Sequence, residues 1–203
     1  MRHFRTLLLA VVVLLSAVPM VHAQSAERAA AEIRQMLTER DQQIKAILEG
    51  DTKNFSEAQR ERLKTLINSV IDFRAMGKQA LGPYWSDLSA KQQDEFVAVF
   101  RDIVRAQSLA DLEVYNSKVT YDTIEVVGDS AFVRTITEYK NTRTPVNYIL
   151  RRSDGTWRAE DIILDGVSTA EGYARSFQTM IRKRSYDFLM KRLRAKREAV
   201  ASR

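Results

Sequence analysis

The sequence contains no cysteine, and its only two histidines, His3 and His22, lie within the first 23 residues. A disulfide framework is therefore excluded, and so is catalysis by a cysteine thiolate. If the N-terminal segment is removed, the remaining chain also lacks the histidine that catalytic triads and most zinc or copper sites require. Carboxylate chemistry is the main catalytic option that stays open.

Glycine and proline are also scarce, with seven and three residues in a chain of 203. No stretch is rich enough in either to form a linker, and no repeat or low-complexity segment is present. The composition therefore predicts one domain, residues 24–203, with a substantial core.

Residues 1–23 are predicted to be a cleaved signal peptide. Arg2 and Arg5 precede the apolar run 6–18, and Val21-His-Ala23 is an acceptable cleavage site. The apolar run is too short to span a bilayer comfortably, and no cysteine marks a lipoprotein. We therefore expect a periplasmic location.

Charge is concentrated at the C-terminus. The whole chain has a net charge of +6, but the segment Arg182–Arg203 alone holds nine basic and two acidic residues. This distribution predicts a basic C-terminal helix over about 187–203 and argues against a broad nucleic-acid-binding face. Such a helix is either a solvated surface or a site for anionic membranes or an acidic protein.

The segment Phe73–Phe100 is predicted to be a helical hairpin. Gly82-Pro83 ends its first helix, and Ser89–Gln92 is a capping box that begins the second. Tyr84 and Trp85 lie at the corner, so they require an apolar surface to pack against.

Apolar spacing predicts the other helices. One covers 25–49, another follows a capping box at Ser56–Gln59, and the second hairpin helix is predicted to continue to about Asn116. A third capping box, Ser168–Glu171, begins a helix that Ser185 interrupts before the basic terminal helix.

Between these helices the apolar period changes to two, which predicts four strands joined by short turns: Val119–Val127, Ser130–Tyr139, a third beginning at Pro145, and Trp157–Leu164. Gly128-Asp129 and Asp154-Gly155 are typical hairpin turns. The predicted fold class is α+β, with a four-stranded antiparallel meander wrapped by N- and C-terminal helices.

Three blocks of residues then occur in a characteristic order. The first comprises Asp72-Phe73, Met76, Leu81-Gly82, Trp85, Leu88, Gln92, Phe96 and Phe100. The second comprises Thr144-Pro145-Val146, Tyr148, Leu150, Trp157, Asp161 and Gly166-Val167-Ser168, and the third comprises Asp187, Leu189 and Leu193. Over about residues 55–197 these blocks resemble the MlaC (toluene-tolerance) family of periplasmic phospholipid carriers.

The sequence departs from the family pattern in one region. Tyr173 and Phe177 keep the family spacing, but Ala174 and Ser176 replace the usual Arg and Gln, and Ser185 replaces a usual Gly. Any head-group or partner contact made there in the family is therefore not carried over.

The resemblance implies a sheet of the nuclear-transport-factor-2-like kind, with helices enclosing an apolar cavity between helices and sheet. It implies a soluble carrier of phospholipid between an outer-membrane lipoprotein complex and an inner-membrane ABC transporter with an MCE-domain subunit. The family's usual direction is from the outer to the inner membrane. A monomer without catalytic residues, metal or cofactor is expected, with phospholipid as the cargo.

The predicted lipid-contacting residues are apolar positions on the packed faces of the helices and strands. They are Met76, Phe96, Phe100, Val104, Leu112, Val133, Tyr148, Leu150, Ile163, Phe177 and Ile181.

Three alternatives stay open. The cargo could be a hopanoid or another polycyclic lipid. The protein could be a small isomerase or lyase of a related fold, with Asp122, Glu125, Glu160 or Asp161 as general base. It could also be an interaction module with a solid core.

Overall fold

The structure is a computed structural model that describes residues 18–49, 56–108 and 112–201. The α-helices are α1 (Val18–Leu48), α2 (Glu57–Asn68), α3 (Phe73–Leu81), α4 (Ala90–Gln107), α5 (Thr169–Lys183) and α6 (Tyr186–Ala201). Two short 3₁₀ helices are η2 (Gly82–Trp85) and η3 (Glu113–Asn116). The strands are β1 (Lys118–Val127), β2 (Ser130–Tyr139), β3 (Thr142–Ser153), β4 (Thr156–Leu164) and β5 (Val167–Ser168).

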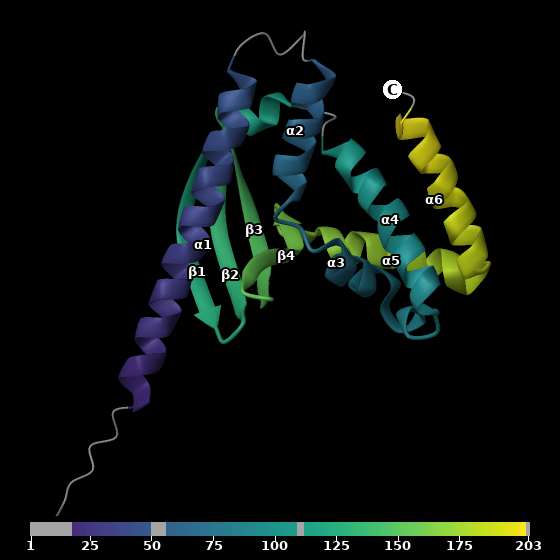
Figure 1. Ribbon diagram of the computed structural model, residues 1–203, viewed down its shortest axis with the longest axis horizontal. Helices are drawn as coiled ribbons and strands as arrows, with labels where there is room; N and C mark the ends of the chain where they lie inside the picture. The colour runs from purple at the N-terminus through teal and green to yellow at the C-terminus, as the bar shows by residue number, and fades with distance from the viewer. Residues whose placement is uncertain (1–17, 50–55, 109–111, 202–203) are drawn as a thin grey trace, which may run out of the picture.

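The chain forms two parts that lie side by side (Figure 1). One part is the antiparallel sheet with α1 packed along it, and the other is a layer of four helices, α3 to α6. Helix α2 lies between them. Most of the predicted signal peptide, residues 1–17, lies outside the described residues, so its cleavage stays a prediction.

The sheet is a five-stranded antiparallel meander in the order β1-β2-β3-β4-β5, not the four-stranded one predicted. The additional strand, β5, has two residues and follows a turn at Asp165 and Gly166, both with positive φ. The third strand begins at Thr142, before Pro145, because Lys140 and Asn141 adopt φ angles of 47° and 65° and form a tight hairpin turn.

Helix α1 covers the packed face of the sheet. Ala29, Ile33 and Leu37 recur at helical spacing, and they pack with buried sheet residues that include Val133 and Leu150. Further along α1, a second small core forms between its C-terminal half and α2. The sheet face is thus filled by α1 rather than by the later helices.

Side-chain caps define most helix starts. Ser56 and Ser89 form the predicted capping boxes with Gln59 and Gln92, and Asp72 Oδ1 accepts a hydrogen bond from the backbone N–H of Ala75 at 2.9 Å. Ser168 accepts from the backbone N–H of the residue three positions later at 3.0 Å. These caps confirm four predicted helix starts.

Helix α4 is shorter than predicted. It ends at Gln107 instead of continuing to about Asn116. The Ser108 hydroxyl donates to the Arg105 carbonyl at 2.8 Å, and the Tyr115 hydroxyl donates to the Ser108 carbonyl at 3.0 Å. Side chains therefore satisfy carbonyl groups that a longer helix would have bonded internally.

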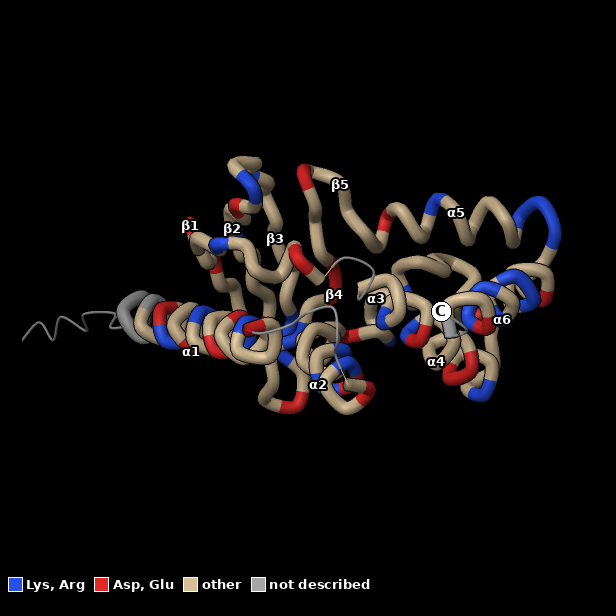
Figure 2. Tube along the Cα trace, turned by 90° about the horizontal axis from the view of Figure 1, so that it is seen from above, with Lys and Arg blue, Asp and Glu red and all other residues tan. Residues whose placement is uncertain are grey.

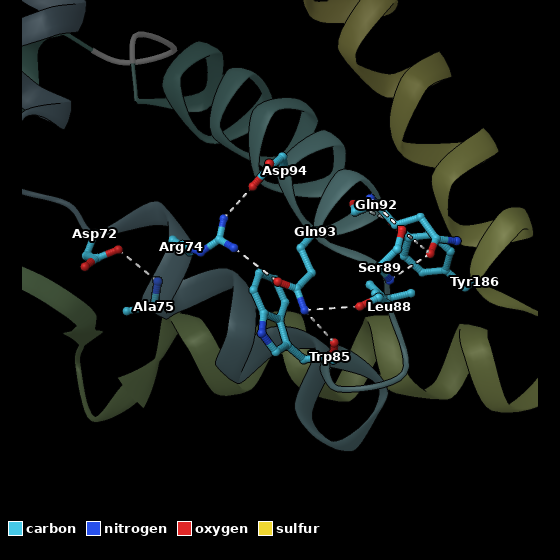
Figure 3. Close-up of polar contacts among 10 residues, drawn as sticks. All are labelled: Asp72, Arg74, Ala75, Trp85, Leu88, Ser89, Gln92, Gln93, Asp94 and Tyr186. Atoms are coloured by element: carbon cyan, nitrogen blue, oxygen red, sulfur yellow. Dashed lines mark hydrogen bonds and ion pairs between the residues drawn. The ribbon is translucent and has the colours of Figure 1, made fainter.

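The corner between α3 and α4 is closed by a polar network (Figure 3). Arg74 donates to Asp94 at 2.7 Å and to Gln93 Oε1 at 3.1 Å, and its guanidinium lies 5.3 Å from the centre of the Trp85 ring. Gln93 Nε2 donates in turn to the carbonyls of Trp85 and Leu88. The predicted hairpin is therefore fixed by α4 side chains that reach back across its corner.

Strand β4 joins the two parts. The backbone N–H of Ala159 donates to the Val70 carbonyl at 2.6 Å, and the N–H of Asp72 donates to the Ala159 carbonyl at 2.8 Å. The residues just before α3 are therefore hydrogen-bonded to the middle of β4, and this fixes the position where α3 begins.

Gly82 sits where α3 meets α5, and its φ of 56° is one that residues with a Cβ rarely adopt. A Cβ placed there would lie 2.5 Å from the Gln178 side chain, which also donates to the Ala80 carbonyl. We expect Gly82→Ala to lower the free energy of unfolding by about 3 kcal/mol, from backbone strain plus displacement of Gln178.

Gly128→Ala is the matched control, because Gly128 has a similar φ of 58° but no atom within 4 Å of a built Cβ. It should cost only about 1 kcal/mol of strain. Equal losses for the two variants in urea denaturation would show that the α3–α5 approach does not require glycine.

Candidate functional site

An apolar pocket of about 420 Å³ lies among helices α4, α5 and α6. Its volume falls within the range of about 300–1,000 Å³ typical of ligand sites. The residues that line it are Phe100, Ile103, Tyr173, Ser176, Phe177, Met180, Leu189, Arg192, Leu193, Ala195 and Lys196.

Two helices contribute most of the lining through the same spacing. On α5 the lining residues begin at Tyr173 and continue at positions 176, 177 and 180, and on α6 they begin at Leu189 and continue at 192, 193 and 196. Positions i, i+3, i+4 and i+7 form one face of a helix. The pocket is therefore built where the lining faces of α5 and α6 meet α4.

Aromatic rings form the floor of the pocket and the core directly behind it, where Phe96 lies. Phe96 and Phe100 of α4 stack with their centres 5.7 Å apart, and Phe177 of α5 lies nearly perpendicular to both, at 6.0 and 6.1 Å. Tyr173 lies edge-on to Phe100 at 4.9 Å. Such geometries are favourable for aromatic pairs, so the floor is a rigid apolar surface.

Tyr173 also places a phenol at the edge of this cluster. Its hydroxyl donates to Gln107 Oε1 at 3.0 Å, and burial raises its pKa above the ordinary value. The phenol therefore stays neutral at physiological pH. None of the residues that line the pocket is acidic, so the pocket carries no negative charge.

The predicted lipid-contacting residues divide among separate cores. Phe100 and Phe177 line the pocket, and Phe96 and Met76 are buried in the same core behind it, with Val104 and Ile181 packed against that core. The others lie elsewhere: Val133, Tyr148 and Leu150 beneath α1, Leu112 in the core shared by α1 and α2, and Ile163 partly buried on β4.

This pocket differs from the predicted cavity in location. The cavity was expected between the helices and the sheet, but no strand residue lines the pocket among α4, α5 and α6. The reason is α1, because Ile33 and its neighbours on α1 fill the sheet face that contains Val133.

Six apolar lining residues are not among the predicted lipid-contacting residues. They are Ile103, Tyr173, Met180, Leu189, Leu193 and Ala195. Their helical spacing was visible in the sequence, and it would have indicated two facing stripes on the last two helices. It would not have shown that the stripes leave a gap.

The candidate general bases on the strands have structural partners or are exposed. Glu125 pairs with Arg134, and Glu160 accepts from Arg151 Nε at 2.7 Å. Asp122 is exposed. None of these carboxylates lines the pocket, which argues against the isomerase or lyase alternative.

Asp161 is the one buried carboxylate among them, with 4% of its surface exposed. Oδ1 accepts from the backbone N–H groups of Ile162 and Ala170, both at 2.9 Å, and Oδ2 accepts from the Ser168 hydroxyl at 2.5 Å. This carboxylate ties β4 to the N-terminus of α5, where the helix dipole also favours a negative charge.

The described residues offer neither a cluster of metal ligands nor a membrane-spanning helix. Within residues 18–49, 56–108 and 112–201, no three His, Cys, Asp or Glu side chains gather as metal ligands. In the same ranges, no helix combines the length and apolar character needed to span a membrane.

Three similarities to known proteins are informative. A sequence model of the MlaC protein family matches residues 38–195. The intermembrane phospholipid transport system binding protein MlaC of Haemophilus influenzae is 22% identical over 142 residues, which is 64% of this chain and 66% of that protein. The chain thus matches just under two thirds of that relative's length.

The third match is a solved structure, a phospholipid-binding protein from Ralstonia solanacearum in complex with a phospholipid. It is 20% identical, with a TM-score of 0.69 over 85% of this chain and 98% of that chain. The similarity confirms the predicted α+β class, an antiparallel sheet with flanking helices. The nuclear-transport-factor-2-like label stays a prediction.

The role of Asp161 can be tested by substitution. We expect Asp161→Ala to lower the free energy of unfolding by about 3 kcal/mol, because three donors lose their acceptor near the start of α5. Asp161→Asn should cost only about 1 kcal/mol, since its amide can still accept at one atom and bond Ser168 at the other. Thermal unfolding followed by circular dichroism measures both. Equal losses would contradict the hydrogen-bonding role.

Proposed function

Because the chain belongs to the MlaC family, we propose that it is a periplasmic phospholipid-binding carrier that holds acyl chain in the pocket among α4, α5 and α6. The observation that carries this proposal is the pocket itself, an apolar space with an aromatic floor and no acidic lining residue. The relatives named above supply the class of cargo.

Energetics explain why such a carrier needs an enclosed apolar site. Each methylene exposed to water costs about 0.8 kcal/mol, so two chains of about fifteen methylenes would cost on the order of 24 kcal/mol. The buried side chains of Phe100, Phe177 and Leu193 offer acyl chain a surface similar to a bilayer interior. Transfer from membrane to protein then comes close to balance, which allows release.

The volume of about 420 Å³ is near the lower end for ligand sites, so a two-chain lipid requires the pocket to widen. Helix α6 is the wall best able to move. The Tyr186 hydroxyl donates a hydrogen bond to the Gln92 carbonyl at 3.1 Å, which fixes the start of α6 against α4. Further along, α6 relies on apolar packing and on exposed ion pairs, which contribute little to stability.

The proposed carrier acts within an ABC-type system. Its partners would be an inner-membrane transporter with an MCE-domain subunit and an outer-membrane lipoprotein complex, as the family resemblance implies. The protein would act as a monomer without cofactor or catalytic step. The positions of the strand carboxylates, away from the pocket, support a carrier over an enzyme.

The decisive test is the content of the protein as isolated. The full chain, expressed with its N-terminal segment and purified from the periplasm, should release phospholipid on organic extraction, and native mass spectrometry should show a matching mass increment. Release of a polycyclic lipid instead would change the identity of the cargo but would still support the carrier function. Protein that is folded and free of lipid would refute the proposal.

A substitution that fills the pocket should reduce the amount of lipid that the protein binds. We expect Met180→Trp to lower the co-purified lipid severalfold, because the larger ring occupies space that acyl chain would use while adding no charge. Ile149→Trp is the control, since Ile149 lies on β3, is 37% exposed and is not a lining residue. Unchanged lipid in Met180→Trp would show that the cargo lies elsewhere.

A further inference from the structure

We propose that Arg192 and Lys196, at the mouth of the pocket, bind the phosphate of an anionic phospholipid head group and make the carrier selective for negatively charged lipids. This inference rests on the proposed function and adds the class of head group. It comes from the charge and pairing of side chains around the pocket.

The two cations lie on the pocket side of α6. Arg192 and Lys196 are four residues apart, which places them on one face of the helix, and both line the pocket. Both are exposed, whereas the lining residues Leu189 and Leu193 of the same helix are buried. The pocket therefore changes from apolar at its floor to cationic at its mouth.

Two of the other cations of α6, Arg194 and Arg197, pair with carboxylates of α4, whereas the exposed Lys191 does not line the pocket. Arg194 bonds Glu95 of α4 at 2.6 Å, and Arg197 lies 3.9 Å from Asp102 of α4. In the described part of the chain, no carboxylate pairs with Arg192 or Lys196. Two basic residues of α6 thus pair with carboxylates of α4, and the two that line the pocket stay available to an anion.

The remaining groups at the mouth favour an anion. Across from α6, the exposed Ser176 of α5 offers a hydroxyl that can donate to a phosphate oxygen. Tyr173 stays neutral because burial raises its pKa, so no lining group repels a phosphate.

The electrostatic field around the pocket is also positive. Basic residues gather at the turn between α5 and α6 and along α6, as Figure 2 shows. They include the exposed run Arg182-Lys183-Arg184 at the end of α5. Such clusters attract anionic lipids. A zwitterionic head group brings its own cation towards this field, so it gains less than a head group with net negative charge.

The test uses delipidated full-length protein offered vesicles of pure phosphatidylglycerol or pure phosphatidylcholine, with native mass spectrometry to measure loading. Wild-type protein should load phosphatidylglycerol several times better. In Arg192→Gln with Lys196→Gln, loading of phosphatidylglycerol should fall severalfold, to about the level of phosphatidylcholine, as expected for the loss of two exposed charge contacts. Loading of phosphatidylcholine should fall less, because the cation of its own head group already offsets much of the attraction to the two side chains.

Lys118→Gln with Arg158→Gln is the matched control, because both residues are exposed on strands β1 and β4, neither lines the pocket, and the loss of charge is identical. It should keep the preference for phosphatidylglycerol. A loss of preference in this control would show that the general field, and not the two mouth residues, selects the lipid, and would overturn the inference.

Two further outcomes separate the inference from the proposed function. If wild-type and mouth variant load both lipids equally, the inference fails while the carrier function stands. If wild-type protein loads neither lipid, the proposed function fails. Inorganic phosphate offered alone should bind far more weakly than phosphatidylglycerol; equally tight binding would indicate a site for the free anion and overturn the lipid assignment.

Discussion

The arrangement of the whole molecule depends on the attachment of two helices to one strand, β4. Backbone hydrogen bonds of Ala159 fix the start of α3, and two residues later the Asp161 carboxylate fixes the start of α5. Because α3 and α5 begin at neighbouring points of the same strand, they run side by side. The sheet thereby sets the position of the helical layer without lining its pocket.

This attachment makes the walls of the pocket unequal. Helix α5 is fixed at its start by buried hydrogen bonds, and α4 is joined to it by the rings of Phe96, Phe100 and Phe177. Helix α6 has no such link to the sheet, and its ion pair from Arg194 to Glu95 is partly exposed. A widening of the pocket therefore requires the least loss of buried contacts if α6 moves, and α6 is also the helix that carries the two mouth cations.

Local signals in the sequence predicted local structure well. Caps such as Ser56 and Ser89 act within one helical turn, so their residue types suffice to locate helix starts. The short turn predicted after Tyr139 was not placed at Lys140 and Asn141, because neither residue is a glycine although both adopt positive φ. The pocket among α4, α5 and α6 was not predicted for a different reason. Val133 and Phe100 are equally apolar and equally buried, and periodicity does not reveal that α1 fills the sheet face in front of one of them.

The proposed carrier must release the lipid that it binds. The pocket suits this requirement because its apolar surface and its exposed cations are separate. In the proposed carrier, apolar burial would balance the loss of the bilayer environment for the acyl chains and would leave little net preference for protein or membrane. Any selectivity must then come from weak contacts outside the apolar floor. Exposed cations such as Arg192 and Lys196 are screened by water and salt. They can bias the choice among lipids without holding one so tightly that delivery to an anionic membrane would stop.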